Sequence, residues 1–264
     1  MKLLKTLLYL TLSTLLVSCN GGLFKYIPLS VDQNLGLMNK EYIDANPFMF
    51  KLLEETSHPI IYENLNKIKD KILASGKVEH KADFQWELKV IDDDSTLNAF
   101  CLPGGYIYVY TGLLKFLDSE DALAGVLGHE MAHADLRHGT NQMIKNSGLS
   151  FLIQLIFGVD NSALVNIGAN LLSLSFSRSD ESEADMKSVE YLYATDYDAR
   201  GGSKFFEKLQ SDQRDPGVVE FISTHPNPEN RVQSITDKWK LLGGKKGKTY
   251  EMEYQALKKE LRKI

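Results

Sequence analysis

Cysteine is scarce in this sequence. Only two of the 264 residues are cysteines, Cys19 and Cys101. Cys19 lies in an N-terminal segment with a fate of its own, so Cys101 has no disulfide partner and a fold held together by disulfides is excluded. We therefore interpret Cys101 as a small, buried apolar residue.

Long apolar runs are also lacking at the N-terminus. Residues 7–17 are mostly apolar, but the run is too short for a membrane-spanning helix. It follows Lys2 and Lys5 and precedes the small Ser18, a pattern typical of a secretory signal peptide. We expect residues 1–18 to be that signal peptide; an uncleaved anchor is the alternative.

The end of this segment indicates a lipid anchor. Residues 16–19, Leu-Val-Ser-Cys, resemble a bacterial lipobox. The resemblance implies cleavage before Cys19, lipid attachment to its thiol, and a short tether over residues 19–31. We therefore expect a periplasm-facing protein bound to a membrane of the bacterial cell envelope through its acyl chains. Asn20 after the cysteine favours the outer membrane.

Basic residues are fewer than acidic ones. The formal net charge of the chain is −5, and it becomes −7 when residues 1–18 are removed with their two lysines. This charge argues against a nucleic-acid-binding surface, so no nucleic acid is expected as a partner. We find no internal repeats, and residues 32–264 are long enough for one compact domain.

Histidine is concentrated in one short stretch, GHEMAHADLRHG, at residues 128–139. On a helix His129 and His133 project from one face, because positions four apart lie above each other. Glu130 lies about 100° round the axis, where it can address a water molecule without being a ligand. This is the HExxH pattern of zinc hydrolases, in which zinc lowers the pKa of its bound water to about 7 and the glutamate takes the proton. The pattern predicts one Zn²⁺ per chain.

The surrounding residues favour a helix. Ser119 is a candidate N-cap, acidic residues follow it, and Gly139 is a candidate stop. HExxH can also arise by chance, but two histidines and a glutamate on an otherwise apolar helix are costly without a partner. A metal removes that cost.

A catalytic zinc usually has a third protein ligand. His138 falls one residue short of the metzincin spacing, and we interpret it as a histidine at a helix C-terminus. A second helix offers an alternative in SFSRSDESEAD, residues 175–185, with Ser179 or Asp180 as its cap. Glu181 and Asp185 share a face there, which suits one metal ligand and one partner for a histidine ring; an acidic, solvated helix start is the competing interpretation.

Four stretches together resemble the HtpX-like, BepA-like and LoiP-like zinc metallopeptidases, the HExxH family that includes the CAAX prenyl proteases. They are NAFCLPGGYIYVYTGLL (98–114), HEMAH (129–133), SRSDESEAD (177–185) and STHPNPENR (223–231). The resemblance implies an α+β, gluzincin-like domain, mostly helical, with a small sheet beside the HExxH helix.

The resemblance also implies roles for individual residues. Glu181 is implied as the third metal ligand and Asp185 as the partner that orients a histidine. His225 is implied to cover the open site or to steady the oxyanion, and Arg231 to anchor the site or contact substrate.

A strand is expected at residues 106–110, Tyr-Ile-Tyr-Val-Tyr, after the turn at 103–105. In zinc peptidases of this type an edge strand pairs with the substrate backbone. We therefore expect substrate contacts at Gly105, Tyr106, Ile107 and Tyr108; an ordinary core strand is the alternative.

The other segments give coarser expectations. Residues 32–75 are predicted to be helical, 84–92 a strand, and 250–264 an amphipathic helix that packs on the core. The apolar segment 149–176 is expected to be buried, with a substrate groove or a surface dipping into a membrane as alternatives.

The expected function is a metalloendopeptidase acting on unfolded or misassembled envelope proteins. Glu130 would be the general base and then the general acid. Two alternatives remain: a lipid-anchored, chaperone-like binding factor with a latent or structural zinc site, and a zinc hydrolase of small esters or amides.

Overall fold

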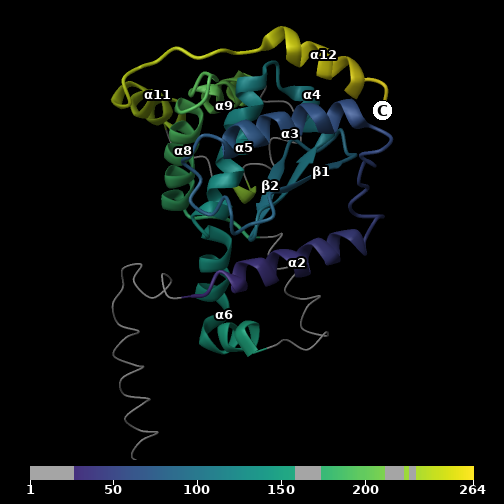
Figure 1. The fold of residues 1–264 in the computed structure, drawn as a ribbon, viewed down its shortest axis with the longest axis vertical. Helices are drawn as coiled ribbons and strands as arrows, with labels where there is room; N and C mark the ends of the chain where they lie inside the picture. The colour runs from purple at the N-terminus through teal and green to yellow at the C-terminus, as the bar shows by residue number, and fades with distance from the viewer. Residues whose placement is uncertain (1–26, 158–173, 212–222, 226–229) are drawn as a thin grey trace, which may run out of the picture.

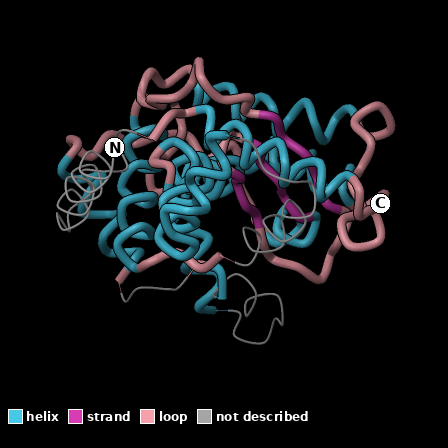
Figure 2. The backbone as a smooth tube through the Cα atoms, turned by 90° about the horizontal axis from the view of Figure 1, so that it is seen from below, coloured by secondary structure: helices cyan, strands magenta, loops and turns pink. Residues whose placement is uncertain are grey.

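The computed structural model describes residues 27–157, 174–211, 223–225 and 230–264. Helices surround a small three-stranded sheet (Figures 1 and 2). The helices are α2 (Ser30–Asp44), α3 (Pro59–Leu73), α4 (Thr111–Phe116), α5 (Glu120–Asp135), α6 (His138–Phe157), α8 (Arg178–Tyr193), α9 (Gly201–Ser211), α11 (Arg231–Leu241) and α12 (Glu251–Leu261). The strands are β1 (Glu87–Ile91), β2 (Ala99–Leu102) and β3 (Tyr106–Tyr110). The predicted α+β class, mostly helical with a small sheet, is confirmed.

The strand order is β1-β3-β2, with β1 parallel and β2 antiparallel to β3. The predicted strand at 106–110 is confirmed, but it is the central strand. Its backbone pairs with β1 from Glu87 to Ile91 and with β2 from Ala99 to Leu102. Because both edges of β3 are occupied, a substrate cannot add beside Tyr106, Ile107 or Tyr108, and the predicted pairing there is wrong.

Alternation along the strands builds one core on each face of the sheet. Ile107 and Val109 of β3 join the main core with α3, α5, α8, α9 and α12. Tyr106 and Tyr108 point to the other face, where they join a second core formed with α2 and the start of α6. Because successive side chains of a strand point to opposite faces, the tyrosines of β3 face the second core with α2, and its aliphatic residues face the main core with α5 and α8.

Helix α5 lies at the centre of the main core, and every residue in it is buried. It packs against α8 and α9. A Cβ added at Gly125 would lie 2.1 Å from the backbone nitrogen of Gly202 in α9, and one at Gly128 would lie 2.7 Å from the Ser188 hydroxyl in α8. These two glycines let both neighbouring helices approach α5 closely.

The second core is fastened to the end of α5 by Arg137, whose backbone has a left-handed φ of 61°. Its guanidinium donates to the Asp32 carboxylate at 2.6 and 2.9 Å and to the Ile27 carbonyl at 2.9 Å. Thr140 donates to the other oxygen of Asp32 at 2.5 Å. The start of α2 is therefore held directly beside the HExxH helix.

The predicted helix over 32–75 is in fact two helices, α2 and α3. The chain turns at 45–50 after α2 and then runs beside β1, where the Leu53 amide donates to the Val90 carbonyl at 2.9 Å. Pro47 cannot continue a helix, which explains the break. The predicted C-terminal helix packs on the core as expected, through Tyr254, Leu257 and Leu261.

Two predictions concern residues that are not described. Residues 1–26, with the predicted signal peptide and Cys19, lie outside the described part of the chain, as do residues 158–173 of the apolar segment. Among the described residues, no helix is both long enough and apolar enough to cross a membrane.

Candidate metal centre

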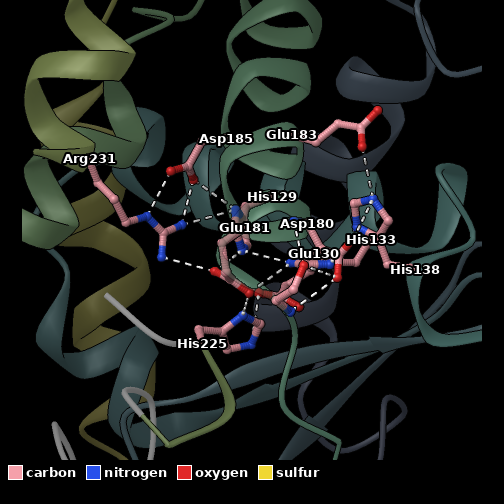
Figure 3. Close-up of polar contacts among 11 residues, drawn as sticks. His129, Glu130, His133, His138, Asp180, Glu181, Glu183, Asp185, His225 and Arg231 are labelled. Atoms are coloured by element: carbon pink, nitrogen blue, oxygen red, sulfur yellow. Dashed lines mark hydrogen bonds and ion pairs between the residues drawn. The ribbon is translucent and has the colours of Figure 1, made fainter. Parts of the chain in front are cut away.

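Four buried side chains converge beside α5: His129, His133, Glu181 and His225 (Figure 3). Each offers one possible ligand atom, and these atoms all lie within 4.8 Å of one another. Two come from α5, one from α8, and one from the short stretch 223–225. The structure thus brings together all three predicted ligands and the predicted loop histidine.

The α5 helix provides the histidine pair. Ser119 precedes it in an extended conformation, and Glu120 and Asp121 occupy its first turn, although the Ser119 side chain makes no capping hydrogen bond. The Nε2 atoms of His129 and His133 lie 3.0 Å apart. The helical spacing therefore aims both imidazoles at one point, as predicted.

The α8 helix provides the carboxylate. Its N-cap is Ser177, which forms a reciprocal capping box with Asp180 and corrects the predicted cap at Ser179 or Asp180. The cap places Glu181 in the first turn, where it is fully buried. Its two carboxylate oxygens lie 3.4 Å from the Nε2 atoms of His129 and His133.

Asp185 lies one turn after Glu181 and contacts the far side of His129. Its carboxylate is 2.9 Å from His129 Nδ1. An acceptor there keeps a proton on Nδ1, so Nε2, on the side of the ring that faces Glu181, is the nitrogen that can bind a metal. The structure thus places Asp185 where an orienting role requires it.

Arg231, the first residue of α11, lies behind these carboxylates and is only 3% exposed. It donates to Asp185 at 2.5 and 2.7 Å and to Glu181 at 3.0 Å. Its side chain also lies over the Phe206 ring. A buried guanidinium engaged in this way cannot contact substrate, so of its two expected roles only the anchoring one fits.

His138 does not lie where the sequence placed it. It is the first residue of α6 rather than a residue at a helix C-terminus, and its Nδ1 is 3.0 Å from the Nδ1 of His133. Its Nε2 faces the Glu183 carboxylate at 3.5 Å. His133 therefore has an imidazole as the partner of its Nδ1, where His129 has a carboxylate. Phe176 stacks on the His133 ring, with ring centroids 3.9 Å apart. The only sequence signal for this contact was the position of His138 directly after the HExxH helix.

Glu130 is 1% exposed, and burial raises the pKa of its carboxyl group. Its Oε1 makes no hydrogen bond with the described residues and lies 3.7 Å from His225 Nε2. The other nitrogen of His225 lies 3.1 Å from Glu181. A buried carboxylate oxygen in this situation needs a further partner, such as a water molecule.

The electrostatics of the cluster suit a cation. Burial opposes ionisation of Glu181 and Asp185, but their contacts with His129 outweigh it and hold both carboxyl pKa values below the ordinary range. Burial likewise opposes protonation of His129, while hydrogen bonds to Asp185 and Glu181 raise its pKa to about 9. Burial lowers the pKa of His133. Two imidazoles and an ionised carboxylate form a donor set that fits a divalent transition metal.

A cleft of about 360 Å³ opens onto the cluster. Glu130 and His225 lie in its wall, together with Phe100, Cys101 and Leu102 of β2. Among the described residues β2 pairs only with β3, so its other edge has no strand partner, and three β2 residues line the cleft. Gly105, in contrast, lies in the β2–β3 turn, where an added Cβ would lie 2.9 Å from the Trp86 nitrogen. The edge strand that lines the cleft is therefore β2, and it is not the predicted stretch 105–108.

Sequence comparisons place these features in a known class. The buried HExxH pair, the carboxylate from a second helix and the adjoining edge strand define a gluzincin-like metallopeptidase domain. The profile of peptidase family M48 matches residues 62–238, most of the described chain, and the protein belongs to this family.

Several curated proteins are similar to this chain. The mitochondrial metalloendopeptidase OMA1 of Schizosaccharomyces pombe is 34% identical over 167 residues, which cover 61% of this chain and 48% of that protein. OMA1 of Arabidopsis thaliana is 36% identical over 163 residues, or 61% of this chain and 33% of that protein. The beta-barrel assembly-enhancing protease of Yersinia pestis is 25% identical over 226 residues, or 80% of this chain and 44% of that protein. The chain thus spans less than half the length of these relatives.

Proposed function

We propose that the protein is a zinc-dependent metalloendopeptidase in which His129, His133 and Glu181 bind one Zn²⁺ per chain. The observation that carries the proposal is the convergence of these buried ligand atoms beside Glu130. Family membership supports the reaction class and favours it over a hydrolase of small esters or amides. The donor set of two histidines and a glutamate is one that catalytic zinc uses.

The side chains divide the chemistry among themselves. A bound zinc ion supplies Lewis acidity and makes water a nucleophile near neutral pH. Glu130 takes a proton from the attacking water at its carboxylate and returns it to the leaving amine. Asp185 holds the His129 ring, and His138 holds the His133 ring. Arg231 holds the carboxylates of Glu181 and Asp185 in place.

An extended polypeptide binds along the free edge of β2. Backbone hydrogen bonds to a strand edge hold a substrate with little demand on its side-chain identity. Phe100 and Leu102 then lie beside the substrate, with Glu130 and His225 in the same cleft. This arrangement suits unfolded chains, because most backbone groups of a folded protein are already hydrogen-bonded within its own helices and sheets.

The physiological setting that we propose is the bacterial cell envelope. The protein would be anchored through lipid on Cys19, face the periplasm from the outer membrane, and cleave unfolded or misassembled envelope proteins. The lipobox-like residues 16–19 support the anchor. The name of the Yersinia pestis relative, a beta-barrel assembly-enhancing protease, supports a role near outer-membrane assembly.

Glu130→Gln tests the assignment in the purified full-length chain. We expect cleavage of an unfolded, reduced and carboxymethylated protein to fall by a factor of about 10² to 10⁴, the usual contribution of a general base. Zinc content should stay near one per chain, because Glu130 is not a ligand. Retained cleavage by the pure variant would rule out the proposed role of Glu130.

A second candidate function rests on the position of His225. Its ring lies among the proposed ligands, so it can close the metal site as a fourth ligand. The protein would then be a latent peptidase or a chaperone-like binding factor. In that case His225→Ala should increase cleavage, whereas in an open site, where His225 steadies the oxyanion, the same variant should decrease it.

A further inference from the structure

An apolar turn lies at one end of the cleft. In the turn at 46–50 the Phe48 side chain is 106% exposed and the Met49 side chain is 65% exposed. Other large apolar side chains are similarly exposed, including Leu241 and Met252, but they lie on α11 and α12, on the opposite side of the molecule from α2 (Figure 1). Only the turn at 46–50 combines this exposure with a place in the cleft among the described residues.

The turn is held firmly in its conformation. The Asn46 carbonyl accepts hydrogen bonds from the backbone amides of Met49 and Phe50, both at 3.0 Å. The Asn46 side chain donates to the Tyr42 carbonyl at the end of α2, at 2.6 Å. Phe50 is buried in the second core and anchors the far side of the turn. The exposure of Phe48 and Met49 is therefore built into the fold, and little conformational entropy is lost when a partner binds there.

The exposed turn is continuous with the reaction site. Met49 and Phe50 line the same cleft as Glu130 and His225. Further apolar side chains line the cleft between them: Phe100, Leu102, Tyr110, Leu174 and Phe176. Phe100 is itself held in place by stacking on Tyr108, with ring centroids 5.0 Å apart. Polar residues, Asp93, Thr96, Asn98 and Thr224, line the rest of the cleft, so apolar side chains form part of the wall that joins Met49 to Glu130.

The charges around the turn favour a polypeptide over a lipid surface. Two lysines near the turn are each paired with an aspartate, Lys40 with Asp44 at 2.7 Å and Lys51 with Asp92 at 2.5 Å. The remaining charges are acidic: Glu41 before the turn, and Glu54 and Glu55 after it. Acidic flanks repel an anionic bilayer, whereas an uncharged apolar segment of an unfolded chain meets no such penalty.

We propose that Phe48 and Met49 form a capture site for apolar segments of unfolded polypeptides and deliver them along the apolar part of the cleft wall to Glu130. The proposal rests on the proposed function and defines its substrate class: chains whose large aliphatic or aromatic side chains are exposed. Such side chains are buried in folded proteins, so the capture site selects unfolded ones.

The test is the double variant Phe48→Ser/Met49→Ser in the full-length chain. The matched control is Leu241→Ser/Met252→Ser, which removes equally exposed apolar side chains far from the cleft. With reduced, carboxymethylated α-lactalbumin as substrate, we expect KM to rise about tenfold in the first variant, with kcat nearly unchanged. A short, polar peptide that occupies only the part of the cleft beside β2 and Glu130, and does not reach Met49, should be cleaved at the parent rate by both variants.

Two outcomes would overturn the proposal: an unchanged KM in the Phe48/Met49 variant, and an equal rise of KM in the control. If KM is unchanged and the variant no longer sediments with phospholipid vesicles, the turn binds a membrane instead of a polypeptide. Binding of the unfolded protein, measured in the Glu130→Gln background, needs no catalysis, so failure of the capture site can be distinguished from failure of the peptidase assignment.

Discussion

At the scale of single residues, the two metal-site histidines are held by different chemistry. His129 faces the Asp185 carboxylate, which is in turn bound by Arg231. His133 faces the neutral donor and acceptor atoms of another imidazole, His138. Because a partner on Nδ1 fixes the tautomer and the orientation of a ligand histidine, we expect His138 to act on the proposed metal site through the orientation of His133.

This contact gives a prediction for His138→Ala. Loss of the partner on Nδ1 should lower zinc affinity by about 10- to 100-fold, the usual effect of losing a hydrogen-bond partner of a ligand. His138→Asn should recover part of the affinity, because its amide can reach the same nitrogen. Competition with a zinc-chelating dye measures both variants without an activity assay. Equal affinity in parent and His138→Ala would show that the contact does not support the site.

Sequence patterns predicted the positions of some residues of the candidate metal site but not of others. Helical spacing predicted the convergence of His129 and His133, and the spacing of Glu181 and Asp185 predicted their shared face. Neither pattern encodes the partners of Arg231, because its contacts with α8 join residues 46 and 50 positions apart. The role of His138 was missed because the sequence does not show that a new helix begins at this residue.

At the scale of elements, close approach of α9 to α5 fixes the scaffold of the site. The approach depends on Gly125, because any Cβ there would overlap the backbone of Gly202. Gly202→Ala is the opposite case: its Cβ would meet the Ile235 side chain at 3.7 Å, an ordinary contact.

The pair of substitutions gives a matched prediction. Gly125→Ala should push α9 away from α5 and lower the free energy of unfolding by about 1–3 kcal/mol, as overpacking does. Gly202→Ala should change it by less than about 1 kcal/mol, since alanine also favours the helix. Urea unfolding followed by circular dichroism measures both. A destabilisation of Gly202→Ala equal to that of Gly125→Ala would contradict the packing account.

The boundaries of an element were predictable where its residues strongly prefer one type of secondary structure. The strand of β-branched and aromatic residues at 106–110 was predicted to the residue. Its neighbour β2 was missed because Ala99–Leu102 is only four residues long and shows no simple alternation. Consequently the edge of the sheet was assigned to the wrong strand, since strand order depends on pairings that a sequence pattern does not contain.

At the scale of the whole molecule, the second core joins the N-terminal part of the chain to the metal-site helix. Arg137 and Asp32 form the link, and both are shielded from solvent. Breaking a buried ion pair by removing one partner leaves an uncompensated charge, which costs far more than breaking a surface pair.

We therefore expect Asp32→Asn to lower the free energy of unfolding by about 3–5 kcal/mol. Asp44→Asn, which breaks the exposed Lys40–Asp44 pair on the same helix, should cost less than about 1 kcal/mol. In limited proteolysis, the Asp32→Asn variant should be cleaved at sites N-terminal to α3 at a higher rate than the parent protein. Equal stability of the two variants would mean that the buried pair does not hold α2 in place.

The central claim is that this fold assembles one zinc site from His129, His133 and Glu181. The most direct measurement is anomalous X-ray diffraction at the zinc absorption edge from crystals of the protein. We expect one zinc peak per chain, about 2.0–2.2 Å from a nitrogen of each histidine and from a carboxylate oxygen of Glu181. No peak in zinc-supplemented crystals, or a peak ligated by other residues, would contradict it.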